Sequence, residues 1–175
     1  GLDPDRRPRE VRQQVGLLFQ NPDDQLFMPT VAEDVAFGPL NLGLEAAEVT
    51  ARVETALARV GVLDLAEKMP QHLSLGQRRR AALATVLAMG CRALVLDEPT
   101  ANLDPHGRRA LLELLGELDI TLLLATHDLD AVLELCPRTI VLDHGQVVRD
   151  GGTAELLAER ELMESHGLEV PWRLR

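Results

Sequence analysis

Aromatic residues are almost absent from this sequence. Phe, Trp and Tyr together make up 2% of its 175 residues, and there is no tyrosine. Few side chains are therefore available to stack on bases, as binding of single-stranded nucleic acid requires. The net charge is −10, which would repel a phosphate backbone. Both features argue against nucleic acid as the main partner.

Cysteines and long apolar runs are also scarce. Cys91 and Cys136 are too few for a disulfide framework, and both lie in apolar stretches, so we expect buried thiols in the cytoplasm. No run approaches the roughly 20 apolar residues that span a bilayer. Residues 1–12 are polar and partly acidic, unlike a signal peptide. Any link to a membrane should therefore go through another protein.

Three short apolar runs carry most of the structural signal. They are separated by helical patterns and lie at 15–19, 93–96 and 120–125. Runs of this kind are typical of parallel strands that are covered on both faces. The sequence therefore predicts an α/β fold, with a parallel sheet flanked by helices.

Helices are predicted between and after these runs. An apolar stripe predicts a helix over 45–60 that ends at Gly61, and this helix belongs to a helical region from about 39 to 71. Asp104 and Pro105 are suited to start a helix that runs to about 118. His144-Gly145 predicts the turn of a hairpin over 139–150. A surface helix is expected over 153–165.

Polar residues follow each apolar run. Gln20 comes after the first, Asp97-Glu98 after the second and Thr126-His127 after the third. Ligands of open α/β sheets collect beyond the carboxyl ends of the strands, so we expect these residues to converge on one pocket. Adjacent side chains on an extended segment diverge. One carboxylate of the pair can thus hold hydrated Mg²⁺ while the other faces an attacking water. The plainer alternative is a strand that ends in two solvated acids.

The segment LSLGQ at 73–77 predicts the start of another helix. Ser74 and Gln77 have the spacing of a capping box, and Gly76 allows close approach to the backbone. The free N–H groups and positive dipole end of this helix suit an anion. An ordinary capped helix explains the segment equally well when it is considered alone.

Taken in order, the motifs resemble the ABC ATPase family. LSLGQ matches the signature motif, ALVLDEPTANLD at 93–104 matches the Walker B strand and D-loop, and LLLATHD at 122–128 contains the switch histidine. The stretch from 15 to 44 and the ending GLEVPWRLR are similar to cobalt-importer and energy-coupling-factor ATPases. The resemblance covers essentially the whole chain.

The resemblance implies roles around ATP and Mg²⁺. Gln20 would be the Q-loop glutamine that reaches Mg²⁺ or the attacking water. Asp97 would support Mg²⁺, Glu98 would orient and polarise the water, and His127 would contact the γ-phosphate. The predicted catalytic residues are therefore Glu98, His127 and Gln20, and the predicted metal ligands are Asp97 and Gln20.

A second group would bind the nucleotide of an opposing subunit. The resemblance implies that Ser74 and Gly76, with Gln77, contact a γ-phosphate held mainly by that subunit, and that Asp104 joins the two sites. It also implies a head-to-tail dimer, homomeric or heteromeric, bound to an integral membrane subunit at the inner face of the cell membrane. ATP hydrolysis would drive import of a metal ion or a vitamin.

The phosphate-binding P-loop is absent from this sequence. A P-loop needs G-x-x-x-x-G-K-[ST], and the only lysine, Lys68, has neither the glycines nor the Ser or Thr around it. We therefore expect a P-loop NTPase-like parallel sheet that lacks its N-terminal part, with partly uncovered apolar faces. We also expect the chain alone to bind ATP weakly or not at all and to be inactive.

Two other functional classes are compatible with parts of this pattern. One is a soluble ABC-type ATPase of DNA repair or chromosome architecture, although Gln20 and Leu73 are separated by one short helical region without the long heptad arms of those relatives. The other is a non-catalytic interaction module derived from the fold. The presence of Glu98 and His127 argues against that module.

The sequence suggests three parts. Residues 1–38 would belong to the ATPase core with the Q-loop, 39–90 to a helical subdomain that ends in the signature helix, and 91–175 to the core again. Two smaller expectations concern packing. Arg78–Arg80 should form a solvated helix face, with a phosphate or partner contact as the alternative. Phe27 and Met28 should be local core residues, with a surface that docks a membrane subunit as the alternative that the resemblance implies.

Overall fold

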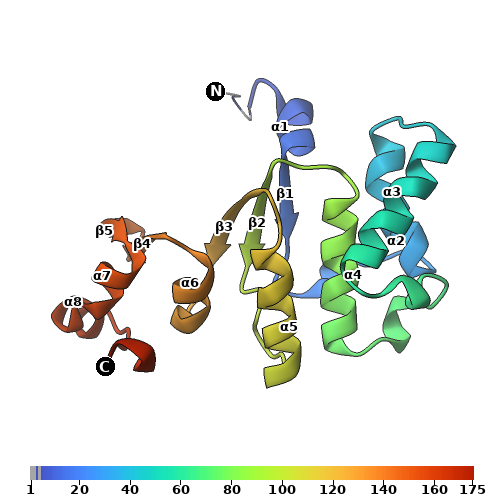
Figure 1. Ribbon diagram of the computed structural model, residues 1–175. Coiled ribbons are helices and arrows are strands. Elements are labelled where there is room, and N and C mark those ends of the chain that lie inside the picture. Colours follow the sequence, from blue (N-terminus) through green and yellow to red (C-terminus); the bar gives the residue numbers. More distant parts are fainter. Residues whose placement is uncertain (1–2, 4) are drawn as a thin grey trace. The chain divides into compact units, whose positions relative to one another are not determined.

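The computed structural model describes residue 3 and residues 5–175. The chain divides into two compact units, residues 1–125 and residues 126–175. The first unit contains a parallel sheet and most of the helices, and the second contains a hairpin with short helices (Figure 1).

Three parallel strands form the sheet of the first unit. They are β1 (Val15–Leu18), β2 (Ala93–Asp97) and β3 (Thr121–Ala125), in the order β1-β2-β3. The register aligns Leu18 with Leu96, and Leu96 with Leu124. Each strand lies within one of the predicted apolar runs or extends it by one residue. The predicted α/β fold with a parallel sheet is thus confirmed.

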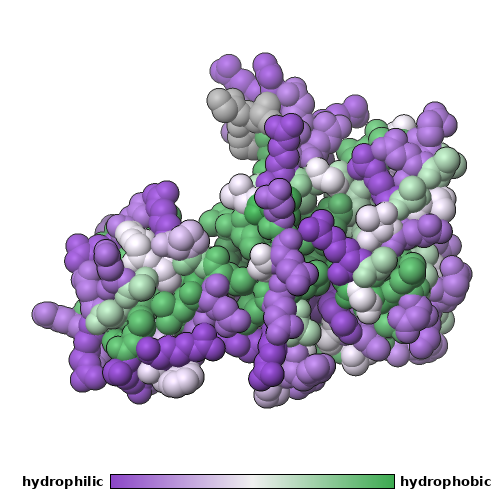
Figure 2. Space-filling model, in the orientation of Figure 1, coloured by the Kyte–Doolittle hydropathy of each residue, from purple (hydrophilic) through white to green (hydrophobic). Residues whose placement is uncertain are grey.

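Only one face of this sheet is well covered. Gly16, Leu18 and Leu96 point to the covered face and are buried. On the opposite face Leu17 is 44% exposed and Leu123 is 60% exposed, and apolar surface is visible over the strands (Figure 2). The expectation of cover on both faces was therefore wrong. The prediction of partly uncovered apolar faces is confirmed for this sheet.

Helix α4 (Leu75–Leu87) packs closely against β1. A Cβ atom placed on Gly16 would overlap Val86 Cγ1 of this helix and lie 3.1 Å from Cys91 Sγ. Because nothing larger than hydrogen fits at this position, Gly16 sets the close distance between the helix and the sheet.

Helices α2 (Val31–Asn41) and α3 (Ala46–Arg59) pack with α4 into a helical group. The predicted helix over 45–60 is confirmed as α3. Its end is a Schellman motif, in which Gly61 N donates to Ala58 O and Val62 N donates to Leu57 O, both at 3.0 Å. Gly61 has a φ of +67°, so glycine is suited to this position.

Helix α2 was not predicted. Thr30 and Glu33 form a capping box at its start, and Pro39 lies inside its last turn. The helical region was predicted to start only at about residue 39, so the observed start of α2 at Val31 corrects that boundary. Two short 3₁₀ helices, η2 (Leu63–Leu65) and η3 (Pro70–His72), connect α3 to α4.

Helix α5 (Pro105–Gly116) precedes β3. Asp104 caps it as predicted, since its Oδ1 accepts a hydrogen bond of 2.8 Å from Gly107 N. The helix ends two residues before the expected 118. The other elements of this unit are α1 (Pro8–Gln14) and η1 (Pro22–Asp24). Among the described residues no helix is long and apolar enough to cross a bilayer.

The second unit is built on a hairpin. Helix α6 (Leu129–Leu135) leads into β4 (Arg138–Asp143) and β5 (Gln146–Gly152), which pair antiparallel. His144 and Gly145 both have positive φ, +46° and +76°. This is the backbone of a type I′ turn, which matches the twist of the strands. The predicted hairpin is confirmed.

The predicted helix over 153–165 is interrupted. The structure has α7 (Thr153–Ala158) and α8 (Arg160–Ser165), because Glu159 between them has a ψ of 88°. The Glu159 carboxylate accepts a 2.8 Å hydrogen bond from Arg149 of β5. The contact lies at the interruption between α7 and α8, and the apolar pattern of the sequence did not predict this interruption. A last 3₁₀ turn, η4 (Trp172–Leu174), follows.

The two cysteines differ in burial. Cys91 is buried, whereas Cys136 is only half-buried, so the expectation of two buried thiols was wrong for Cys136. Cys136 directly follows α6, at the start of the connection to β4. Loss of solvent around each sulfur raises the pKa of both thiols, which disfavours the reactive thiolate.

Candidate functional site

Three of the predicted site residues lie at one edge of the sheet. Gln20 follows β1 by two residues, Asp97 ends β2 and Glu98 comes next. Because β1 and β2 are parallel neighbours with Leu18 beside Leu96, these side chains emerge at the same carboxyl edge. Gln20 and Asp97 are exposed and Glu98 is half-buried. A ligand can therefore reach this edge.

The backbone turns sharply at Glu98. Its φ is +44°, in the left-handed region that residues other than glycine rarely adopt. The Glu98 N–H donates to Ala125 O at 2.8 Å, so the last hydrogen bond between β2 and β3 holds the residue in place. Surrounding contacts that maintain an unfavourable conformation are common at functional sites.

Arg79 of α4 binds the segment that follows Glu98. Its Nη1 donates to Glu98 O and to Pro99 O, each at 2.8 Å, and its Nη2 donates to Ala101 O at 3.2 Å. The residue is 2% exposed, and loss of solvent lowers the pKa of its guanidinium. The expectation of a solvated face over 78–80 was therefore wrong for Arg79, because backbone carbonyls about 20 residues away accept its donors.

Arg78 is also engaged. It forms an ion pair with Asp23, with Nε 3.2 Å from Oδ1, and its Nη1 donates to Leu73 O at 2.9 Å. Arg80 is half-buried. None of the three arginines is thus a freely solvated side chain.

The loop after Gln20 is attached to α4 through Gln25. The Gln25 Nε2 donates to Ala82 O and to Thr85 Oγ1, both at 2.8 Å, while its Oε1 accepts from Phe19 N at 3.2 Å. Gln25 was not among the predicted site residues. These bonds fix the loop that carries Gln20 to the same helix that contacts Glu98.

The N-terminal tip of α4 is capped as predicted. Ser74 Oγ accepts from Gln77 N at 3.3 Å, and Gln77 Oε1 accepts from Ser74 N at 2.9 Å. A Cβ on Gly76 would meet no other part of the chain closer than Leu103, at 3.9 Å. The packing of the chain therefore does not require glycine here, and the space above Gly76 is open to a ligand.

A pocket of about 250 Å³ lies beside this tip. Its walls come from the start of α4 and from the loop that leads into α5. It contains Ser74, Gly76 and Gln77, which were predicted to contact a second nucleotide, and Asp104, which was predicted to join the two sites. Arg80 and His106 also line it. His106 was not predicted, because no motif marks it. Helix N–H groups and Arg80 make this pocket suited to an anion.

His127 lies in the second unit, between β3 and α6. Leu129 N donates to His127 O at 3.0 Å, and the next residue, Asp128, caps α6 by accepting from Ala131 N at 3.0 Å. The role of His127 at a γ-phosphate stays a prediction.

The donors at the sheet edge fit Mg²⁺ rather than a metal held by protein alone. Within the described part of the chain, no group of three or more His, Cys, Asp or Glu side chains could hold a metal ion. Asp97 and Gln20 offer a carboxylate and an amide oxygen. Mg²⁺ typically binds one or two such oxygens together with water and substrate phosphates, so these residues suit an ion that arrives with a nucleotide.

Phe27 forms part of an exposed apolar surface. It is 61% exposed and packs edge-on against Phe37, with ring centroids 5.0 Å apart. Buried Asp34 fixes the Phe27 loop, because its Oδ1 accepts from Phe27 N and Met28 N at 2.9 and 3.0 Å. The expectation of a core residue was thus wrong for Phe27, while Met28 is half-buried.

Sequence comparisons identify relatives. A family model described as ABC transporter matches residues 2–101. A putative ABC transporter ATP-binding protein of Streptomyces avermitilis is 56% identical over 167 residues, which cover 95% of this chain and 64% of that protein. The energy-coupling factor transporter ATP-binding protein EcfA of Methanosphaera stadtmanae is 46% identical over 165 residues, covering 93% and 59%. The chain thus spans about two thirds or less of the length of these relatives.

Solved structures show the same fold. CbiO1 from Clostridium perfringens, described as part of the ABC transporter complex cbiONQ, has a TM-score of 0.78 and 42% identity over 89% of this chain and 64% of that chain. The ATP-binding cassette MJ0796, a dimer in a post-hydrolysis state with ADP and Pi, has a TM-score of 0.72 and 28% identity over 87% and 68%.

Proposed function

Because this chain belongs to the ABC transporter family, we propose that it acts in the ATP-hydrolysing subunit of an ABC-type importer. The observation that carries the proposal is the shared edge of β1 and β2, where Gln20, Asp97 and Glu98 emerge together. A carboxylate pair and an amide at the ends of parallel strands suit a nucleotide and its metal ion.

In this proposal Glu98 performs the acid–base step. Its carboxylate accepts a hydrogen bond from the attacking water and orients it toward the γ-phosphate. Asp97 and Gln20 would hold Mg²⁺, which neutralises charge on the phosphate oxygens when bound. His127 would donate to the γ-phosphate. The left-handed backbone at Glu98 supports this assignment, because such strain is concentrated at active sites.

The pocket at the tip of α4 would contact the nucleotide of a second subunit. Ser74, Gly76 and Gln77 line it from the start of α4, and Asp104 lines it from the loop before α5. In a two-fold head-to-tail dimer, this tip of one subunit would complete the nucleotide site of the other. The dimer of MJ0796 with ADP and Pi supports this arrangement.

A membrane subunit would dock near the loop that carries Gln20. Phe27 and Phe37 expose apolar surface there, and exposed aromatic residues are common at interfaces. EcfA and CbiO1, as named above, support an importer at the inner face of the cell membrane that carries a metal ion or a vitamin. We retain the three-part division at 38/39 and 90/91 within this proposal, although α2 crosses the first boundary.

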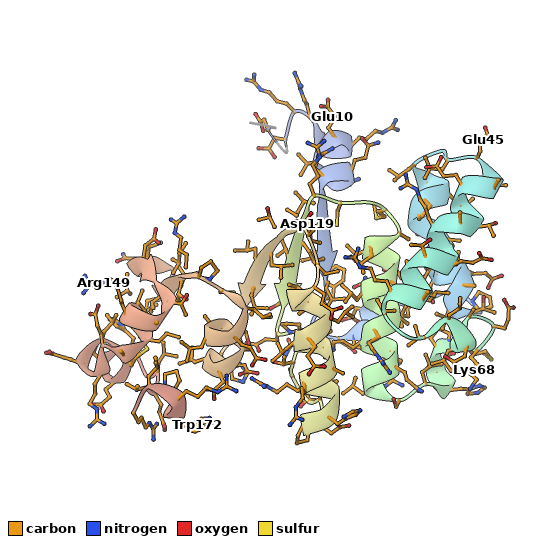
Figure 3. All side chains as sticks on the ribbon, in the orientation of Figure 1. Glu10, Glu45, Lys68, Asp119, Arg149 and Trp172 are labelled. Atoms are coloured by element: carbon orange, nitrogen blue, oxygen red, sulfur yellow. The ribbon has the colours of Figure 1, made fainter. Side chains whose placement is uncertain are left out.

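The 175-residue chain alone should bind ATP weakly and hydrolyse none. Its sequence has no G-x-x-x-x-G-K-[ST], and Lys68 is exposed in the connection between α3 and α4 (Figure 3). Calorimetry with MgATP tests this. Micromolar affinity for the isolated chain would contradict it.

Replacement of Glu98 by Gln tests the catalytic assignment. The variant is measured in a polypeptide that contains this sequence together with a P-loop. Gln keeps the shape but cannot accept the proton, so we expect kcat to fall by about 10²-fold or more. Glu113→Gln, an exposed position on α5, is the matched control and should leave kcat unchanged. Equal turnover of Glu98→Gln and the unchanged protein would refute the assignment.

A further inference from the structure

We propose that Arg79 is a positioning residue for the hydrolysis step, in that it sets the backbone conformation from which Glu98 presents its carboxylate. This inference rests on the proposed function, because it assigns Arg79 a task only if Glu98 acts on the water. Arg79 also lines the pocket at the tip of α4, but its Nη1 and Nη2 donate to backbone carbonyls of residues 98–101, so we do not expect it to bind the nucleotide.

The guanidinium of Arg79 connects three carbonyls of one short turn. Glu98 O and Pro99 O accept from Nη1, and Ala101 O accepts from Nη2. Ala101 N also donates to Glu98 O at 3.1 Å. The turn is therefore held by one internal hydrogen bond and by three hydrogen bonds from Arg79. The guanidinium group is planar and its N–H groups point in fixed directions, so it is well suited to bind several acceptors at once.

Arg79 is buried, so its polar contacts are with the protein rather than with water. The residue is 2% exposed, and its Nε is buried without a hydrogen-bond partner. In the described part of the chain Arg79 makes no salt bridge with a carboxylate. Removing a cation from water is unfavourable unless donors and acceptors are matched. An apolar side chain would fill this space without that penalty, so packing alone does not account for an arginine here.

Arg79 binds a turn whose backbone conformation is unfavourable by itself. Glu98 has a φ of +44° and Asn102 a φ of +59°, so two residues of the turn adopt the left-handed region. Such conformations persist only when neighbouring contacts fix them. The Glu98 N–H bond to Ala125 fixes one side of the residue, and Arg79 fixes its carbonyl. Without Arg79, Glu98 would retain its side chain but lose its orientation.

Arg79→Met is the main test, because Met is of similar length and donates no hydrogen bond. In a polypeptide with both this sequence and a P-loop, we expect kcat to fall at least about tenfold, as small misplacements of catalytic groups do. The KM for ATP should stay within about twofold, because Ser74 and the nucleotide contacts are unchanged. A purely structural role would instead lower the amount of folded enzyme without changing kcat per active site.

The matched control is Arg52→Met. Arg52 also donates to two carbonyls of the α4 end, Ala88 O and Met89 O, both at 3.3 Å, but lies away from Glu98. Its kcat should equal that of the unchanged protein. Hydrogen exchange at the Ala101 N–H of the 175-residue chain gives a readout that does not depend on activity: exchange should be faster in Arg79→Met and unchanged in Arg52→Met.

Arg79→Lys decides the question if Arg79→Met does not fold. Lysine keeps the positive charge but lacks the planar guanidinium with its several N–H donors. We therefore expect kcat to be at least about threefold below that of the unchanged protein, with KM unchanged. A folded Arg79 variant with full kcat would overturn the inference, provided that Glu98→Gln is inactive. If Glu98→Gln retains full activity, the proposed function fails first, and the two failures are thereby distinguished.

Discussion

The contact between Gly16 and Val86 predicts an energetic coupling between sheet and helix. Gly16→Ala would place a Cβ inside Val86 Cγ1, and valine has little rotamer freedom with which to move. Overpacking of this kind destabilises by about 1–3 kcal/mol. Val86→Ala removes the obstructing methyl from a buried position and by itself costs about 1.5–2.5 kcal/mol.

The double variant should cost less than the sum of the two. The methyl that alanine adds at residue 16 would occupy space that Val86→Ala vacates, so we expect a coupling of at least about 1 kcal/mol. Single substitutions should each lower the midpoint of thermal unfolding by roughly 2–12 °C for a chain of this size. Part of that loss should be recovered in the double variant.

The assay must report on the first unit. Trp172, the only tryptophan, lies in the second unit, and there is no tyrosine (Figure 3), so fluorescence does not follow the sheet and α4. Far-UV circular dichroism during urea unfolding is suitable, because the longest helices belong to the first unit. Strict additivity of the two substitutions would refute the packing argument.

Two further predictions concern carboxylates. Burial raises the pKa of Asp34, so its neutral form contributes stability at low pH that is lost as the pH rises through the folded pKa. Asp34→Asn retains an acceptor for the Phe27 and Met28 N–H groups without charge, and should raise the urea midpoint at pH 7 but less at pH 4.5; an equal effect at both pH values would contradict this. The hydrogen bond between His166 Nδ1 and Asp143 Oδ2, at 2.8 Å, lowers the pKa of Asp143. The pairing therefore stabilises the fold at pH values above the pKa of Asp143 in the unfolded chain. This stabilisation is lost as the pH falls through the pKa of Asp143 in the folded protein. In His166→Leu the pKa of Asp143 should rise toward its ordinary value in a carboxyl NMR titration; an unchanged titration would refute the role of His166.

Local signals predicted several elements from the sequence. The Ser74 capping box, the Asp104 cap and the Gly61 end of α3 each depend on a few neighbouring residues, and the structure confirms all three. The same kind of signal was present at Thr30 and Glu33, where a capping box starts α2. That helix was not predicted, because the helical region was taken to begin only at about residue 39, after this capping box.

Contacts between distant residues could not be predicted in this way. Arg79 follows the signature segment in a run of three arginines that suggested a solvated face, and its burial depends on carbonyls of residues 98–101. Gln25 likewise binds Ala82 and Thr85 of a helix far along the chain. Hydrophobic periodicity reports which face of a helix is apolar, but it does not identify which polar groups meet after folding.

The left-handed backbone at Glu98 bears on how such a site can be lost during evolution. Glycine adopts this conformation without steric penalty, so Glu98→Gly would remove the carboxylate and relieve the backbone strain in one substitution, although a more flexible unfolded chain offsets part of that gain. If Glu98 orients the water as proposed, an ATPase that contains this sequence would therefore lose its activity through this substitution with little loss of folding stability. Selection on turnover, rather than on stability, must then preserve glutamate at this position.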